Sequence, residues 1–169
     1  MKNHYKMDRP SWDEYFMEIA FLVRSRSTCV TRQVGAVMVD MQNRILSTGY
    51  NGTPRGTTHC NEGGCPRALP IVKGERTLEE HKKHFSGRDL ESCNAVHAEI
   101  NAIIQAAQIG RLPKEFKVYV TDFPCSYCLP SLLNAGCKEI YYAKEYSYEP
   151  NRNLLNETGC KIKQIILEK

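Results

Sequence analysis

Two short motifs contain side chains that bind metals and move protons. The first is His97-Ala98-Glu99, and the second is Pro124-Cys125-Ser126-Tyr127-Cys128. Together they supply one imidazole, two thiols and one carboxylate. A zinc ion held by one histidine and two thiolates keeps a fourth coordination position for water, as hydrolytic zinc sites do. The motifs therefore predict a catalytic zinc centre with His97, Cys125 and Cys128 as its ligands.

Glu99 is the only acidic residue in the two motifs. Zinc bound by two thiolates acidifies water less than zinc bound by three neutral histidines, so such a site needs a base. A carboxylate beside the water can take its proton and deliver it to a substrate nitrogen. We expect Glu99 to be this proton shuttle and not a ligand. The pattern resembles the signature of zinc deaminases, which assigns the same roles.

The spacing within each motif predicts where it lies. Cys125 and Cys128 are three positions apart, so they share one face of a helix that begins at Cys125, whose N-terminus favours thiolates. His97 and Glu99 are two positions apart and would diverge inside a helix. We therefore expect them at the very start of a helix.

A C-x-x-C pair alone is also found in redox sites and in structural zinc sites. The competing interpretation is a closed zinc site, in which a fourth protein ligand fills the position that water would take. His97-Ala98-Glu99 upstream and Pro124 before the first cysteine favour the catalytic interpretation.

The composition is that of one globular domain. The chain has 169 residues, 41% of them hydrophobic and 25% charged. We expect a single domain over residues 1–169, with a polar insertion at about 57–94. The net charge of +4 is not gathered in one basic run, so it does not indicate nucleic-acid binding, although it suits a small anionic substrate.

Eight cysteines are many for this length. The first six residues contain no apolar run of the kind that a signal peptide needs, and no stretch is long enough to span a membrane. We therefore expect a reducing cytoplasm, where metal binding explains surplus cysteines better than disulfides do.

The N-terminal part predicts one helix and a hairpin. Ser11 and Glu14 form a capping-box pattern, and apolar residues follow at helical spacing to about Arg26. Residues 34–39 and 44–49 have the pattern of two paired strands.

Two polar residues flank these elements. Arg26 lies where the helix should end, so it either complements the helix dipole or belongs to a phosphate site. Asn51 lies in a loop with two glycines and a proline, so it either stabilises the turn or binds a substrate sugar.

The polar segment 57–94 cannot form a core of its own, although a short helix is expected near 77–85. A second zinc could stabilise it, because Cys60 and Cys65 are five positions apart and Cys29 and Cys93 have no other assigned role. The alternative is that these are free reduced thiols.

The remainder alternates helices with strands. Helical spacing follows His97 as far as Gly110, a strand over 117–121 leads into the cysteine motif, and a strand over 138–142 follows its helix. A short helix near 151–158 and a last strand over 161–167 complete the chain. Together these elements predict an α/β fold, a three-layer α/β/α domain with a central mixed five-stranded sheet. Both motifs should lie at one end of this sheet.

Beyond the zinc motifs, three stretches carry a family resemblance. They are Gln33-Val34-Gly35-Ala36-Val37, Gly49-Tyr50-Asn51-Gly52-Thr53-Pro54 and His97-Ala98-Glu99-Ile100-Asn101-Ala102-Ile103. From about Ser11 to Tyr146 the chain resembles the cytidine and deoxycytidylate deaminase superfamily, and within it the deoxycytidylate (dCMP) deaminases. The resemblance implies a cytidine deaminase-like fold. It also implies a cytoplasmic zinc hydrolase that converts dCMP to dUMP and ammonia for thymidylate synthesis.

The resemblance also implies substrate contacts and a second metal. Asn51 would contact the sugar, the Ala98 backbone N–H the base carbonyl, and Arg26 and Tyr146 the phosphate or base. Some members hold a second, structural zinc with cysteines that correspond to Cys29 and Cys60. Here Cys65 and Cys93 would complete it, with His84 as a competing ligand.

Many members are homohexamers regulated by dCTP and dTTP, and others are unregulated; no membrane or nucleic-acid partner is implied. Two rival functions stay open. The nearer is another zinc deaminase, acting on cytidine, a riboflavin-pathway pyrimidine or a tRNA adenosine. The more distant is a non-catalytic interaction module stabilised by zinc.

Overall fold

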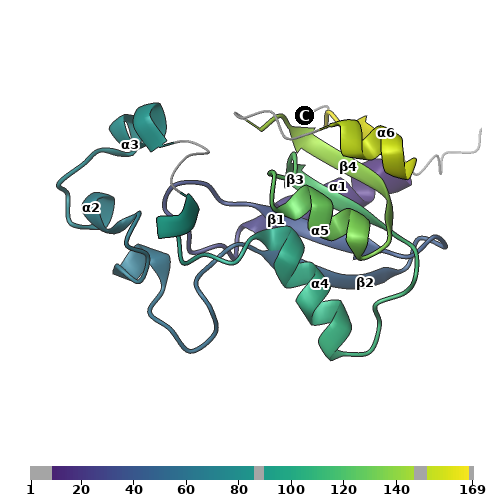
Figure 1. Ribbon diagram of the computed structural model, residues 1–169, viewed down its shortest axis with the longest axis horizontal. Coiled ribbons are helices and arrows are strands. Elements are labelled where there is room, and N and C mark those ends of the chain that lie inside the picture. Colours follow the sequence, from purple (N-terminus) through teal and green to yellow (C-terminus); the bar gives the residue numbers. More distant parts are fainter. Residues whose placement is uncertain (1–8, 86–89, 147–151, 168–169) are drawn as a thin grey trace, which may run out of the picture.

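A computed structural model describes residues 9–85, 90–146 and 152–167 and contains a five-stranded sheet (Figure 1). The strands are β1 (Gly35–Val39), β2 (Ile45–Tyr50), β3 (Phe116–Asp122), β4 (Cys137–Lys144) and β5 (Lys161–Gln164). Their order is β2-β1-β3-β4-β5. β1 runs antiparallel to β2 and β3, whereas β4 runs parallel to β3 and β5. The predicted mixed sheet is confirmed.

Helices cover both faces of this sheet, and each face has its own apolar core. α1 (Trp12–Arg24) packs on one face; α4 (Ala98–Gln108), α5 (Cys128–Asn134) and α6 (Asn153–Thr158) pack on the other. Successive residues of β1 alternate between the cores, because strand side chains point to opposite faces. Val37 contributes to the core beneath α1, and Ala36 and Met38 contribute to the core beneath α4 and α5. The predicted three-layer α/β/α arrangement is confirmed.

Several predicted boundaries shift by a few residues. Ser11 caps α1 and exchanges both capping-box hydrogen bonds with Glu14, but the helix ends at Arg24 and not at Arg26. α5 begins at Cys128 and not at Cys125, because residues 124–127 form the turn by which the chain leaves the sheet. The last strand ends at Gln164, where its pairing with Tyr142 of β4 ends.

The described residues between 57 and 94 form a lobe that stands away from the sheet (Figure 1). The lobe contains the short helices η1 (Cys60–Glu62), α2 (Leu69–Val72), α3 (Leu78–Phe85) and η2 (Leu90–Ser92). The helix expected near 77–85 is confirmed as α3, whereas α2 was not predicted, because four residues are too few to show a helical period.

No helix in the described part of the chain combines the length and the apolar character that crossing a membrane requires.

Candidate active site

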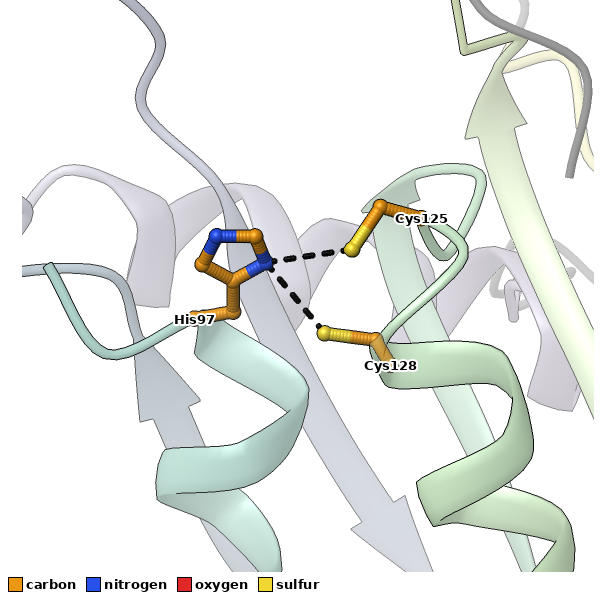
Figure 2. Close-up of side chains that lie close together, drawn as sticks. All are labelled: His97, Cys125 and Cys128. Atoms are coloured by element: carbon orange, nitrogen blue, oxygen red, sulfur yellow. Dashed lines mark hydrogen bonds between the residues drawn. The ribbon is translucent and has the colours of Figure 1, made fainter. Parts of the chain in front are cut away.

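The three predicted zinc ligands lie at the starts of two neighbouring helices (Figure 2). His97 is the N-cap of α4, in extended conformation with φ −72° and ψ 155°. Cys128 is the first residue of α5, and Cys125 lies in the turn before it, where its carbonyl accepts a hydrogen bond from the Leu129 N–H at 2.9 Å. The expectation that His97 and Glu99 lie at the start of a helix is therefore met.

Backbone pairing fixes the position of His97. The preceding residue, Val96, forms an isolated β-bridge with Gly52, with N–H to carbonyl distances of 2.8 and 3.2 Å. In the first turns of α4, the Asn101 side-chain amide donates to the Tyr50 carbonyl at 2.8 Å. The end of β2 and the loop that follows it are thus joined to the start of α4 at two points.

The ligand atoms form a compact group. The Nδ1 atom of His97 lies 3.3 Å from the Sγ atom of Cys125 and 3.3 Å from that of Cys128 (Figure 2). Among the described residues, this is the one set of three or more histidine, cysteine or acidic ligand atoms within 4.8 Å of one another.

This donor set fits zinc. With Zn–S near 2.3 Å and Zn–N near 2.0 Å, the ligand atoms of a tetrahedral ion lie roughly 3.5 Å apart. The described part of the chain brings no fourth ligand into the group, so the arrangement matches an open hydrolytic site and not a closed structural one.

Neighbouring groups shift the pKa values of Cys125 and His97. A hydrogen bond from the Cys128 thiol lowers the pKa of Cys125 to about 4, against the effect of burial, and His97 lowers it further. The hydrogen bond to Cys125 in turn raises the pKa of His97. Cys125 is therefore a thiolate at neutral pH, the form in which cysteine binds zinc.

Glu99 lies in the first turn of α4 with 4% of its surface exposed. Its burial raises the pKa of the carboxyl group to about 7, although the nearby His97 opposes this shift. Its carboxylate does not belong to the compact ligand group, but it hydrogen-bonds the Cys128 thiol. A carboxyl group beside a metal site with a pKa near neutrality can both accept and donate a proton.

A pocket contains the candidate ligands His97 and Cys125 together with Glu99. Of the predicted substrate contacts, Asn51, Ala98 and Tyr146 line it as well. Arg26 does not. It lines an adjacent groove that shares Thr31, Arg32, Lys82 and other residues with the pocket.

Most hydrogen-bonding groups of the Asn51 side chain have partners within the protein. Its Oδ1 accepts hydrogen bonds from the Val34 N–H at 2.8 Å and the Ser27 hydroxyl at 2.7 Å, and its Nδ2 donates to the Arg32 carbonyl at 2.7 Å. An amide nitrogen has two N–H groups, so one donor is left for a ligand. Asn51 therefore stabilises its loop while it lines the pocket.

Tyr146 forms part of the pocket wall beside an arginine. The Arg32 guanidinium carbon lies 4.7 Å from the centroid of the Tyr146 ring, a cation–π geometry. Burial raises the pKa of the Tyr146 hydroxyl, so the phenol stays neutral at physiological pH.

Arg67, His81 and Lys82 are among the pocket residues that sequence reasoning missed. They come from the lobe formed by the described residues of 57–94. The helical spacing of Leu78, His81 and Phe85 would have placed His81 on the inner face of α3, but a polar eight-residue helix gives a weak signal.

The predicted ligands of a second zinc lie close together: Cys60, Cys65 and Cys93 come from the lobe, and Cys29 comes from the segment that follows α1. Cys29, Cys60 and Cys65 are buried together, with Cys93 packed against them. The thiol of Cys60 hydrogen-bonds those of Cys29 and Cys65, and the Cys65 and Cys93 sulfurs lie 3.8 Å apart. The four thiols form a chain of contacts without three sulfurs within 4.8 Å of one another, and His84 is exposed.

The sequence matches a family model and several curated proteins. The model for the cytidine and deoxycytidylate deaminase zinc-binding region matches residues 10–144. Deoxycytidylate deaminase of Schizosaccharomyces pombe is 40% identical over 159 residues, which cover 94% of this chain and 45% of that protein. ComE operon protein 2 of Bacillus subtilis is 33% identical over 96% of this chain and 75% of that protein. The chain spans 45% of the length of each of two yeast relatives, from S. pombe and Saccharomyces cerevisiae.

A solved structure has the same fold. The dCMP deaminase of cyanophage S-TIM5, in complex with dCMP and dUMP, is 26% identical and has a TM-score of 0.70, covering 94% of this chain and all of that one. The three-layer architecture is therefore that of the cytidine deaminase-like proteins. The family match includes both zinc motifs and all strands but the last. The chain belongs to the cytidine and deoxycytidylate deaminase family.

Proposed function

We propose that this chain is a zinc-dependent hydrolase that converts dCMP and water to dUMP and ammonia. One observation carries the proposal: His97, Cys125 and Cys128 form a three-ligand group, and the buried Glu99 lies in the same pocket. The names of its relatives support the substrate, since the S. pombe protein is a deoxycytidylate deaminase and the S-TIM5 enzyme was crystallised with dCMP and dUMP.

His97, Cys125 and Cys128 would hold the zinc ion. When bound, zinc supplies Lewis acidity, which lowers the pKa of water at the site. Glu99 takes a proton from the attacking water and delivers it to N3 of cytosine. It then takes the remaining proton from the hydroxyl group formed at C4 and delivers it to the amine, which leaves C4 as ammonia. Its pKa of about 7, raised by burial, suits a group that must do both.

Other pocket residues orient the substrate. The free Nδ2 proton of Asn51 is available to a sugar hydroxyl. The Ala98 backbone N–H lies at the start of α4 and has no partner within the helix, so it is available to the base carbonyl. We propose Arg26 and Tyr146 as contacts near the phosphate or the base, with Arg26 acting from the adjacent groove.

A substrate panel tests the reaction. Ammonia release would be measured with dCMP, deoxycytidine, CMP and an adenosine-containing RNA hairpin, and zinc content would be determined on the same sample. We expect the highest kcat/KM for dCMP. A preference for deoxycytidine or for the RNA would instead indicate one of the other zinc deaminases.

We propose that Cys29, Cys60, Cys65 and Cys93 bind a second, structural zinc. Their clustering supports this, because it joins the lobe, which has little apolar core of its own, to the segment that follows α1. Elemental analysis should give about two zinc atoms per chain. Cys60→Ser should lower this by one, whereas Cys137→Ser and His84→Ala should not; a value near one in fully loaded wild-type protein contradicts the site.

The wider setting is also a proposal. We propose one domain over 1–169, a cytoplasmic location and a homohexamer, with dCTP and dTTP as effectors. All eight cysteines are free thiols in the structure, which suits a reducing compartment. Light scattering with and without each nucleotide measures the oligomer, and a monomer under all conditions contradicts the hexamer.

A further inference from the structure

α3 buries a histidine whose polar atoms have no partner in the described structure. His81 is 1% exposed, and neither of its ring nitrogens makes a hydrogen bond to another described residue. Its ring stacks on the Phe85 ring with centroids 5.1 Å apart. This contact packs one face of the imidazole but gives its nitrogens no hydrogen bond. Buried polar groups normally find a partner, so an imidazole of this kind indicates a ligand.

His81 lies in the wall of the pocket that contains Glu99 and the candidate zinc ligands. It is not part of a metal group, because no set of ligand atoms among the described residues includes it. The burial of the ring lowers its pKa, and the neighbouring Arg67 and Arg76 lower it further. The ring is therefore neutral, with one N–H donor to offer.

Two cationic side chains accompany His81 in this wall. Arg67 donates through Nη2 to the Phe85 carbonyl, which fixes the guanidinium group against α3. Its Nε is buried and makes no hydrogen bond to any described residue. Lys82 lines both the pocket and the adjacent groove.

We infer that His81 and Arg67, with Lys82, form the subsite that binds the phosphate of a nucleoside monophosphate. A phosphate monoester offers several acceptor oxygens and a double negative charge. It matches the imidazole N–H, the guanidinium Nε–H and the ammonium group of this wall. The subsite would select a nucleotide over the nucleoside, which has no group to meet these donors. This inference rests on the proposed function, because it names how the proposed enzyme recognises its substrate.

The test compares dCMP with deoxycytidine in matched variants. Arg67→Met and His81→Leu remove the donors but keep apolar bulk, His81→Gln keeps an N–H donor, and Lys83→Gln alters an exposed residue of α3 outside the pocket. For dCMP, kcat/KM should fall about 100-fold in Arg67→Met and His81→Leu, mainly through KM. His81→Gln should lose less, Lys83→Gln should match the wild type, and deoxycytidine turnover should stay within about 3-fold in all variants.

Two results would overturn the subsite. Equal losses of kcat/KM for dCMP and deoxycytidine would show that His81 and Arg67 have a structural role only. An unchanged kcat/KM for dCMP in Arg67→Met would show that Arg67 does not contact the phosphate. Calorimetric binding of dCMP to each zinc-loaded variant provides a readout that does not need turnover. A wild type that binds dCMP without deaminating it would contradict the proposed function and leave the subsite intact. Failure of Arg67→Met to weaken dCMP binding would contradict the subsite alone.

Discussion

Gly49 of β2 lies directly against the Ala98 carbonyl at the start of α4. A Cβ atom at Gly49 would lie 2.1 Å from that oxygen and 2.5 Å from the Ala102 nitrogen. No side chain fits there, so the helix that presents His97 and Glu99 can approach the sheet only over glycine. The position of the candidate site therefore depends on a residue that carries no chemistry of its own.

Gly49→Ala should move the start of α4 and damage both stability and turnover. The overlap is with backbone atoms, so we expect a loss of about 1–3 kcal/mol in the free energy of unfolding. A displacement of His97 and Glu99 by about 1 Å should lower kcat by roughly 100-fold. Urea unfolding and steady-state kinetics measure the two effects. Gly52→Ala is the control, since its Cβ would contact only the Thr28 hydroxyl, at 3.4 Å.

Glu99→Gln should abolish turnover while zinc remains bound. The amide keeps the size of the side chain but cannot carry the proton, so we expect kcat to fall by about 10²–10⁴-fold. Elemental analysis and ammonia release on the same sample separate the two properties. Glu79→Gln, at an exposed position of α3, should leave both unchanged. Zinc loss in Glu99→Gln would show that the carboxylate is a ligand, and full turnover would show that Glu99 is not the proton shuttle. Absence of turnover in the zinc-loaded wild type would favour the non-catalytic interaction module.

Cys125→Ala should remove one zinc atom per chain together with all turnover. Only two of the three ligands would remain, and the group has no fourth protein ligand among the described residues to replace the lost thiolate. Cys137→Ala is the matched control, because Cys137 is also buried but lies in the core beneath α5 and α6. Retention of zinc and activity in Cys125→Ala would contradict the assigned ligand set.

Asp13 joins α1 to strands β3 and β5, and Asp13→Ala should be destabilising. Its carboxylate accepts hydrogen bonds from the Tyr119 hydroxyl at 2.9 Å and from the Lys163 ammonium at 2.7 Å. The buried Tyr119 hydroxyl would lose this carboxylate acceptor, at a cost of about 1–3 kcal/mol. Thermal unfolding would show this as a lower Tm. Glu18→Gln, at an exposed position of α1, should have no measurable effect.

The order of the elements could be predicted from local pattern. A capping box marks the start of α1, an unbroken apolar run marks β1, and apolar residues recur at helical spacing after His97. Each of these signals arises within a short stretch of chain. The start of α5 was three residues early in the prediction. Cys125 belongs to the turn because the Phe123 N–H still bonds the Lys144 carbonyl of β4 at 2.8 Å, a contact between distant segments.

The sequence by itself determined which groups can bind zinc and move a proton, since an imidazole, two thiols and a carboxylate are covalent properties of His97, Cys125, Cys128 and Glu99. Only the tertiary structure decided what surrounds them. In the folded chain most of the Asn51 amide hydrogen-bonds other protein groups, Arg26 lines the adjacent groove and His81 of α3 lines the pocket. The physical reason is that a short polar helix gains its position from packing against the rest of the fold, and its own residues do not encode which neighbour it will meet.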